Sequence, residues 1–247
     1  GLNQILSRRP FRSLVNSDAL SVVLVDLTDP DYPVFAGVDE DHERYAASLP
    51  KIGILLGVLN EVEKGSLEYT PELRSQLVGM IRRSSNTTSS DLIRLIGFEA
   101  IEEVLTDPAY ELYDETRAGG IWVGKGYGGM GVWQRDPLSQ LSHAATARQV
   151  ARFLVMMERG ELVSPWASSE MKDVMGDPAI KHKFVLGLDS RPGSRIFRKS
   201  GTWRRYHADA ALVERNGRRY VAVALLEAEQ NRGYLSRLIV ELDDLVF

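Results

Sequence analysis

The chain has 247 residues, of which 44% are hydrophobic and 26% charged, so it can bury a substantial core. A net charge of -4, with no basic stripe of interleaved aromatics, argues against a nucleic-acid partner. The absence of cysteine excludes disulfides, thiol catalysis and thiolate metal sites. No apolar run approaches the roughly 18 residues that a membrane span requires.

The first residues predict a helix and then two strands. Residues 2–15 have helical periodicity, and residues 19–27 form a β-branched run that ends in a turn cluster with two prolines. Residues 32–40 follow this turn and are expected to pair with the first strand as a hairpin.

The middle of the chain predicts helices. Apolar residues recur with a period near 3.6 over residues 52–65, 71–84, 89–105, 143–160 and 164–175. His143 is expected in the cap region of its helix, and Ser168 or Ser169 is expected to cap the last one. Residues 118–140 are rich in glycine and aromatics and are expected to form a long structured loop.

Strands return near the C-terminus. Residues 194–201 alternate, and Asn216-Gly217 separates two apolar runs within residues 209–228, which is a strong hairpin signal. A helix is expected over residues 233–247. This order predicts an α+β fold in which one antiparallel sheet is made from both chain ends and flanked by the terminal helices. We expect one lobe from residues 1–45 and 187–247, and an all-helical lobe from residues 46–186.

Ser48 and Lys51 stand at the start of the apolar run IGILLGVL. Residues three apart share one face of a helix, so the two side chains are expected to touch. Pro50 fits a first helical turn, which puts Ser48 at a helix N-terminus, where free N–H groups favour negative charge. A buried lysine of lowered pKa can take the serine proton, but Ser-x-x-Lys also arises by chance, as in Ser169 to Lys172.

Two further motifs supply what an acyl-transfer site needs. The Ser84-Ser85-Asn86 stretch offers a hydroxyl to relay a proton and an amide to bind a substrate amide. The Lys199-Ser200-Gly201-Thr202 stretch lies on an expected strand. There Lys199 is expected to hold a substrate carboxylate and Gly201 to let a substrate backbone lie close. The Thr202 N–H is expected to complete an oxyanion hole with the Ser48 N–H.

The ordered trio S-x-x-K, S-x-N and K-[ST]-G resembles the penicillin-recognising serine hydrolases, namely class A β-lactamases and penicillin-binding proteins. The resemblance covers nearly the whole chain and implies their two-lobed fold. It also implies that Ser48 is acylated, Lys51 is its base or proton relay, and Ser84 is the shuttle hydroxyl. By the same resemblance, Asn86, Lys199, Ser200, Gly201 and Thr202 bind substrate. It favours a periplasmic or secreted location, and the start at Gly1 allows for an export signal already removed.

The chain departs from the family pattern at two places. Ser85 replaces the usual aspartate of the second motif. The loop also lacks the E-x-x-x-N pattern whose glutamate activates the deacylating water in class A enzymes. Nearby carboxylates that could replace it, if they are not simply solvated, come from three residues: Asp114, Glu115 and Asp136. Tyr127 and His207 are further candidates for this base.

The sequence therefore predicts a serine hydrolase that acts on an amide or ester of a small molecule or peptide. A weak class A β-lactamase-like activity on a cyclic amide is the first expectation. A penicillin-binding-type peptidase, transpeptidase or esterase of the same fold is the alternative, and a non-catalytic module that binds cell-wall peptides is the second. We expect no cofactor, and no metal because the four histidines lack paired ligand spacing. A monomer is expected.

Overall fold

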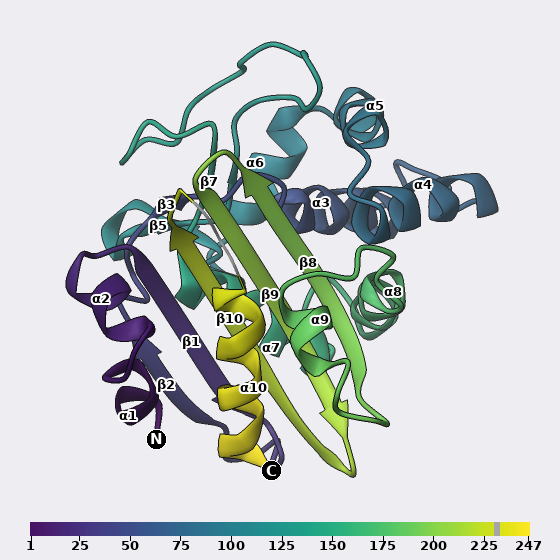
Figure 1. The fold of residues 1–247 in the computed structure, drawn as a ribbon. Helices are drawn as coiled ribbons and strands as arrows, with labels where there is room; N and C mark the ends of the chain where they lie inside the picture. The colour runs from purple at the N-terminus through teal and green to yellow at the C-terminus, as the bar shows by residue number, and fades with distance from the viewer. Residues whose placement is uncertain (230–232) are drawn as a thin grey trace.

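A five-stranded antiparallel sheet built from both ends of the chain forms the centre of the protein (Figure 1). The computed structural model describes residues 1–229 and 233–247. The strand order is β2-β1-β10-β9-β8. The strands are β1 (Leu20–Asp26), β2 (Val34–Val38), β8 (Arg195–Trp203), β9 (Tyr206–Arg215) and β10 (Arg218–Glu227). The expected α+β class and the sheet from both chain ends are confirmed.

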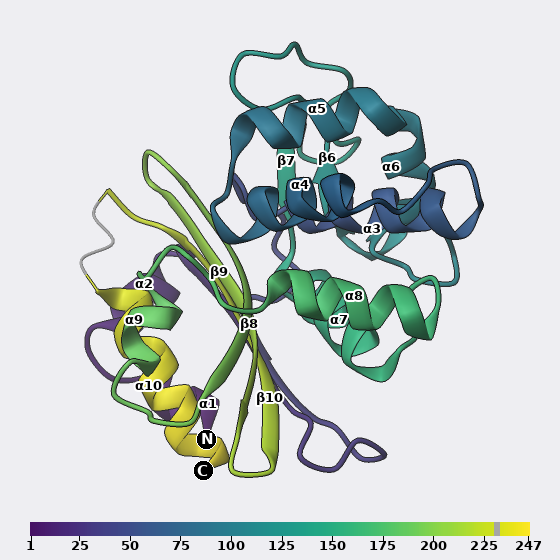
Figure 2. The ribbon, with the colours of Figure 1, turned by 90° about the vertical axis from the view of Figure 1, so that its right-hand side faces the viewer.

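Helices cover both faces of this sheet (Figure 2). The terminal helices and one short helix pack on one face, and they are α1 (Leu2–Leu6), α2 (Phe11–Asn16), α9 (Phe184–Leu188) and α10 (Tyr234–Val246). The opposite face meets α7 (Ala147–Arg159) and α8 (Pro165–Met175). Because both faces are covered, β1 is buried along nearly its whole length, which explains its continuous apolar sequence.

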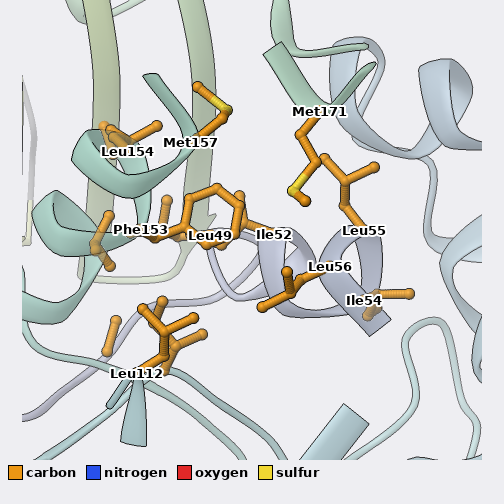
Figure 3. Close-up of a cluster of buried hydrophobic side chains, with 14 of the residues drawn as sticks. Leu49, Ile52, Ile54, Leu55, Leu56, Leu112, Phe153, Leu154, Met157 and Met171 are labelled. Atoms are coloured by element: carbon orange, nitrogen blue, oxygen red, sulfur yellow. The ribbon is translucent and has the colours of Figure 1, made fainter. Parts of the chain in front are cut away.

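The remaining helices lie next to α7 and α8, beside one end of the sheet (Figure 2). They are α3 (Lys51–Glu63), α4 (Pro71–Arg82), α5 (Asn86–Ile96) and α6 (Phe98–Thr106). Helix α3 is buried on every side from Lys51 to Leu59. Figure 3 shows Ile52, Leu55 and Leu56 of this helix among the side chains of Phe153 and Met171. A helix that is apolar all round is typical of a core position, so the turn before it is held in place by packing.

Short strands join the segment between α6 and α7 to the turn before α3. A small sheet with the order β3-β7-β6 contains β3 (Arg44–Tyr45), β6 (Trp122–Val123) and β7 (His143–Ala145). Strands β4 (Tyr113–Asp114) and β5 (Gly119–Gly120) flank a single 3-10 turn, η1 (Glu115–Arg117). The expected long loop over residues 118–140 is therefore tied down by strand pairing at its start.

Several predicted boundaries are wrong for local reasons. The expected helix over residues 2–15 is two short helices separated around Pro10. The helix expected over residues 89–105 breaks at Gly97, whose φ of 82° is left-handed. His143 lies in β7 rather than at a helix start, and Thr146 caps α7 by accepting from Gln149 N. Ser164, and neither Ser168 nor Ser169, caps α8.

The hairpin at Asn216-Gly217 is confirmed. Arg215 pairs with Arg218 across it, and the two turn residues have φ angles of 50° and 77°. Positive φ at both positions is what a two-residue turn between twisted strands needs. Within residues 1–229 and 233–247, no helix is long and apolar enough to cross a bilayer.

Truncating Leu55 to alanine should lower the free energy of unfolding by about 2–5 kcal/mol, because a fully buried side chain of α3 leaves a cavity. Leu95→Ala is the matched control, since Leu95 is 52% exposed on α5 and its loss should change stability by about 0.5 kcal/mol or less. Urea unfolding of the three proteins measures both values. Equal losses in the two variants would contradict the buried position of α3.

Candidate active site

Ser48 lies in a tight turn between β3 and α3. The turn is closed by the Leu49 N–H donating to the Ala46 carbonyl (3.0 Å) and the Ile52 N–H donating to the Leu49 carbonyl (3.3 Å). Ala47 has a left-handed φ of 52°, which is a costly conformation for alanine. The turn leaves Ser48 partly exposed between buried neighbours. Within the described chain, no acceptor takes its N–H.

Lys51 begins α3 and is fully buried. Its Nζ donates to the Ser84 carbonyl (2.8 Å), the Asn86 Oδ1 (2.8 Å) and the Ser85 carbonyl (3.4 Å). Burial without a carboxylate partner lowers the pKa of Lys51 to about 7. A substantial fraction of this side chain is therefore neutral near neutral pH, which a general base requires.

The expected direct contact between Ser48 and Lys51 is not made as a hydrogen bond. Among the described residues, the Ser48 hydroxyl has no hydrogen-bond partner, and the three donors of Lys51 all point at oxygens of the Ser84–Asn86 turn. The reason is that Ser48 precedes the helix rather than lying in its first turn. Loss of one proton from Lys51 is needed before it can accept from Ser48.

Ser84 connects Lys51 to a second buried lysine. Its carbonyl accepts from Lys51, and its hydroxyl accepts from Lys199 Nζ (2.9 Å). Lys199 is 1% exposed, and burial, followed by the charge of Lys51, lowers its pKa well below the ordinary value. Because the Ser84 oxygen accepts from Lys199, its own proton is free to be donated elsewhere.

The motif between the lysines folds as a helix start. Ser84 adopts a left-handed φ of 55°, and the Ser85 hydroxyl accepts from Thr88 N (3.2 Å) as the cap of α5. Ser85, which replaces the usual aspartate of the family motif, therefore caps α5 as an aspartate there could also do. Asn86 is held through its Oδ1 by Lys51, and its NH2 group has no acceptor among the described residues.

Gly201 brings β8 against the Ser48 turn. A Cβ on this residue would lie 2.1 Å from the Ala46 carbonyl oxygen and 2.9 Å from Ser48 N. The glycine is therefore required by the protein's own backbone, and the expectation that it also lets a substrate backbone lie close stays a prediction. Of its neighbours, Ser200 has its hydroxyl 3.3 Å from His182 Nε2, and the exposed Thr202 accepts through Oγ1 from Lys183 Nζ (2.8 Å).

A family comparison agrees with this arrangement. A model described as "Beta-lactamase enzyme family" matches residues 69–246, which is more than half of the chain. The chain belongs to the β-lactamase enzyme family. The matched region begins after the Ser48 turn and includes Ser84 and the β8 motif. A search of curated protein sequences found no match.

Solved structures of this family have the same fold. A class A β-lactamase from Bacteroides cellulosilyticus DSM 14838 is similar with a TM-score of 0.73, at 16% identity over 100% of this chain and 95% of that one. PBP-A is similar with a TM-score of 0.71, at 20% identity over 99% and 92%. A β-lactamase from Sphaerobacter thermophilus DSM 20745 gives a TM-score of 0.71 at 15% identity over 94% and 92%.

Tyr127 occupies the space beside Lys51. Its ring centroid lies 4.4 Å from Lys51 Nζ, and its hydroxyl donates to the Ala47 carbonyl (3.3 Å). Ser90 holds the Tyr127 backbone from both sides, donating to its carbonyl (2.5 Å) and accepting from its N–H (3.0 Å). Burial raises the pKa of Tyr127 well above 10, so the phenol stays neutral and is no base.

The candidate loop carboxylates have other partners. Asp136 is fully buried, not solvated, and accepts from Leu138 N (3.0 Å) and Ser139 N (2.8 Å). Asp114 accepts from Thr116 N (2.8 Å), and Glu115 is exposed. In the described part of the chain, no carboxylate forms a hydrogen bond or ion pair with Ser48, Lys51, Ser84 or Lys199. Asp136 is thus a structural anchor of its loop.

His207 also has a structural role. Its Nε2 lies 3.2 Å from the Ala228 carbonyl oxygen, and it pairs with Thr202 across β8 and β9. Burial lowers its pKa, so the ring is neutral at neutral pH.

Sequence reasoning missed Ser90, Lys183 and a buried ion pair. Ser90 lies one helical turn after Asn86 and therefore on the same helix face, and this spacing is the one sequence feature that could have pointed to it. Arg198 pairs with Asp209 on the neighbouring strand (2.6 Å), and both side chains are buried. Lys183 lies in no motif.

Glu43 should give the protein a measurable pH dependence. Burial, followed by its hydrogen bond to Asp136, raises the pKa of Glu43 from 4.5 to about 7. The folded state therefore holds a proton that the unfolded chain releases, and this stabilisation is lost as pH rises from 4.5 towards 7. We would measure the free energy of unfolding of Glu43→Gln and of the unmodified protein in urea at pH 5 and pH 8. We expect the difference between variant and unmodified protein to favour the variant more at pH 8 than at pH 5.

Glu115→Gln is the matched control for this experiment. Glu115 is exposed on the same segment as the anchor, so its loss should shift the unfolding curves equally at both pH values. A pH-independent difference between Glu43→Gln and the unmodified protein would contradict the raised pKa of Glu43.

Proposed function

We propose that this chain is an active-site-serine enzyme that forms an acyl-enzyme at Ser48 with cyclic amides of the β-lactam type and hydrolyses them weakly. One observation carries the proposal. A buried lysine of lowered pKa, a serine with a free backbone N–H, and a second lysine linked through Ser84 converge from three separate segments. A passive binding module gains nothing from two buried ammonium groups that cost desolvation energy.

Acylation follows from these positions. Neutral Lys51 accepts the proton of the Ser48 hydroxyl, and Oγ attacks the carbonyl carbon of the amide. The tetrahedral oxyanion is bound by the Ser48 N–H and by the Thr202 N–H of the adjoining strand. The intermediate collapses by breaking the C–N bond. The departing nitrogen takes the Ser84 hydroxyl proton, which the Lys199 ammonium replaces at 2.9 Å.

Release of the acyl group has weaker support. Hydrolysis of the ester needs a base that takes a proton from water, and no carboxylate contacts the described site residues. Tyr127 fills the space beside Lys51 and stays neutral. Only Lys51 itself is left as a base. This favours slow hydrolysis, or the penicillin-binding-type peptidase or esterase that is the alternative function. PBP-A, similar in fold, includes a mutant solved as an acyl-enzyme complex with penicillin G.

Intact-protein mass spectrometry tests the proposal directly. Mixing the protein with benzylpenicillin should add the mass of one penicillin to Ser48, with a long-lived adduct and little hydrolysed penicillin. Ser48→Ala should give no adduct, because the nucleophile is gone. Ser169→Ala is the matched control, since it alters a Ser-x-x-Lys pair that lies within α8. Neither adduct nor hydrolysis with either benzylpenicillin or an activated ester, in a folded protein, would overturn the proposed function.

Replacing Tyr127 by glutamate should accelerate release of the acyl group. Ser90 would still hold the backbone of residue 127, so the new carboxylate would lie beside Lys51 and could activate water. We expect the adduct lifetime to fall by at least about 100-fold, the usual value of a general base. Time-resolved mass spectrometry measures it.

Tyr127→Phe is the matched control for that substitution. It keeps the ring over Lys51 and loses only the hydroxyl that binds the Ala47 carbonyl, so the adduct should remain long-lived. Equal lifetimes in the glutamate and phenylalanine variants, in folded proteins that acylate, would show that a base at this position is not what release lacks.

A further inference from the structure

Lys183 lies between α8 and α9, outside every motif of the family pattern. Its side chain is only 6% exposed, although lysine is rarely buried without a carboxylate partner. All three of its donors go to oxygens of the β8–β9 hairpin instead: Gly201 O (2.6 Å), Thr202 Oγ1 (2.8 Å) and Ala208 O (3.0 Å). The nearest carboxylate, Asp209, is taken by Arg198 and by the Phe184 N–H.

The three contacts fix the direction of one peptide group. Gly201 and Ala208 face each other across β8 and β9, and a single ammonium reaches both carbonyl oxygens. Both carbonyls therefore point into the space between the two strands, as in a hydrogen-bonded antiparallel pair. In a trans peptide the N–H points opposite to the C=O. The N–H that shares the peptide group of Gly201 O is that of Thr202, so it points away from β9.

The Thr202 N–H therefore points towards the proposed oxyanion site. Strand β8 is the last strand in the sheet order, so the side away from β9 has no partner strand. The Ser48 turn packs against Gly201 of this edge strand, with Ser48 N 2.9 Å from the position of a Cβ on that glycine. The Thr202 N–H thus points to the open side of the strand at the residue next to this contact, and the Ser48 N–H has no acceptor among the described residues.

We infer that Lys183 is a positioning residue for acyl transfer: its ammonium clamps the Gly201 carbonyl, which aims and polarises the Thr202 N–H as an oxyanion donor. The inference rests on the proposed function. A positive charge at the oxygen of a peptide group withdraws electron density from its nitrogen and strengthens the N–H as a donor. Because the oxyanion exists only in the transition state and intermediate, this effect should accelerate acylation without improving substrate binding.

The charge of Lys183 is available at neutral pH. Burial lowers the pKa of Lys183 to about 8. The negative charge of Asp209 raises this pKa, and the positive charge of Arg198 lowers it. Other titratable groups close enough to feel its charge are His182 beside it, Lys199 on β8 and His207 on β9. All three have lowered pKa values, so both histidines are neutral at pH 7.

Pre-steady-state acylation kinetics test the inference. We would measure the acylation rate constant and the dissociation constant of the non-covalent complex separately with a fluorescent penicillin, in the unmodified protein and in Lys183→Met. Loss of one oxyanion donor costs about 10²–10³ in rate. We expect a loss of at least 10-fold in the acylation rate constant, with the dissociation constant changed less than 3-fold.

Two comparisons separate this role from simple support of the hairpin. Lys181→Met removes the same charge two residues earlier from an exposed side chain and should leave both constants unchanged. Lys183→Arg keeps the positive charge and Lys183→Gln keeps neutral donors. If the methionine variant does not fold, these two carry the test. The arginine variant should acylate faster than the glutamine variant at equal thermal stability.

The outcomes distinguish the inference from the proposed function. A folded, neutral Lys183 variant that acylates within 3-fold of the unmodified protein would overturn the inference alone. So would a loss confined to the dissociation constant. An unmodified, folded protein that neither forms an adduct with penicillin or activated ester nor hydrolyses them would overturn the proposed function and the inference with it.

Discussion

The arrangement of the site depends on how two buried ammonium groups are satisfied without carboxylates. Lys51 and Lys199 are both nearly inaccessible, and both end on serine, asparagine and main-chain oxygens. Neutral acceptors satisfy the donors but do not neutralise the charges, so the free energy of ionisation stays unfavourable and the lysine pKa falls. A carboxylate hydrogen-bonded to Lys51 in place of these oxygens would have stabilised the ammonium form and raised the lysine pKa. The scarcity of negative charge around Lys51 is therefore what gives the lysine its chemical use.

This arrangement constrains three distant segments at once. Ser84 must offer its carbonyl to one lysine and its hydroxyl to the other, which it does from a left-handed backbone that costs about 1 kcal/mol or more. Gly201 must have no side chain, because β8 touches the Ser48 turn. Helix α3, buried on all sides, holds Lys51 in place by packing alone. The strained backbone at Ser84 and the close approach at Gly201 are thus maintained by the apolar packing of α3.

Under the proposed function, the same scarcity of carboxylates makes release of the acyl group slow. Among the acidic side chains of the loop, Asp136 holds backbone N–H groups and Asp114 accepts from Thr116 N. Ser90 fixes the backbone of Tyr127, whose neutral ring covers Lys51. The loop is thus built to be rigid, and its rigidity places an aromatic ring, rather than a base, next to the nucleophile. Acylation and release are separate chemical demands, and the protein's side chains serve mainly the first.

The sequence by itself determined the α+β class, the order of the long strands, the Asn216-Gly217 hairpin and the motifs around Ser48, Ser84 and Lys199, because each rests on local periodicity or spacing. It missed the short strands β4 to β7, which lie within the expected all-helical lobe of residues 46–186. It misplaced the breaks at Pro10 and Gly97 and the caps of α7 and α8, where single residues compete with a periodic pattern. Only the tertiary structure decided that Lys51 bonds the Ser84 turn instead of Ser48, that Asp136 is an anchor, and that Lys183 reaches the Gly201 carbonyl. The physical reason is that burial and long-range hydrogen bonds arise when segments far apart in the chain pack together, and no local pattern records them.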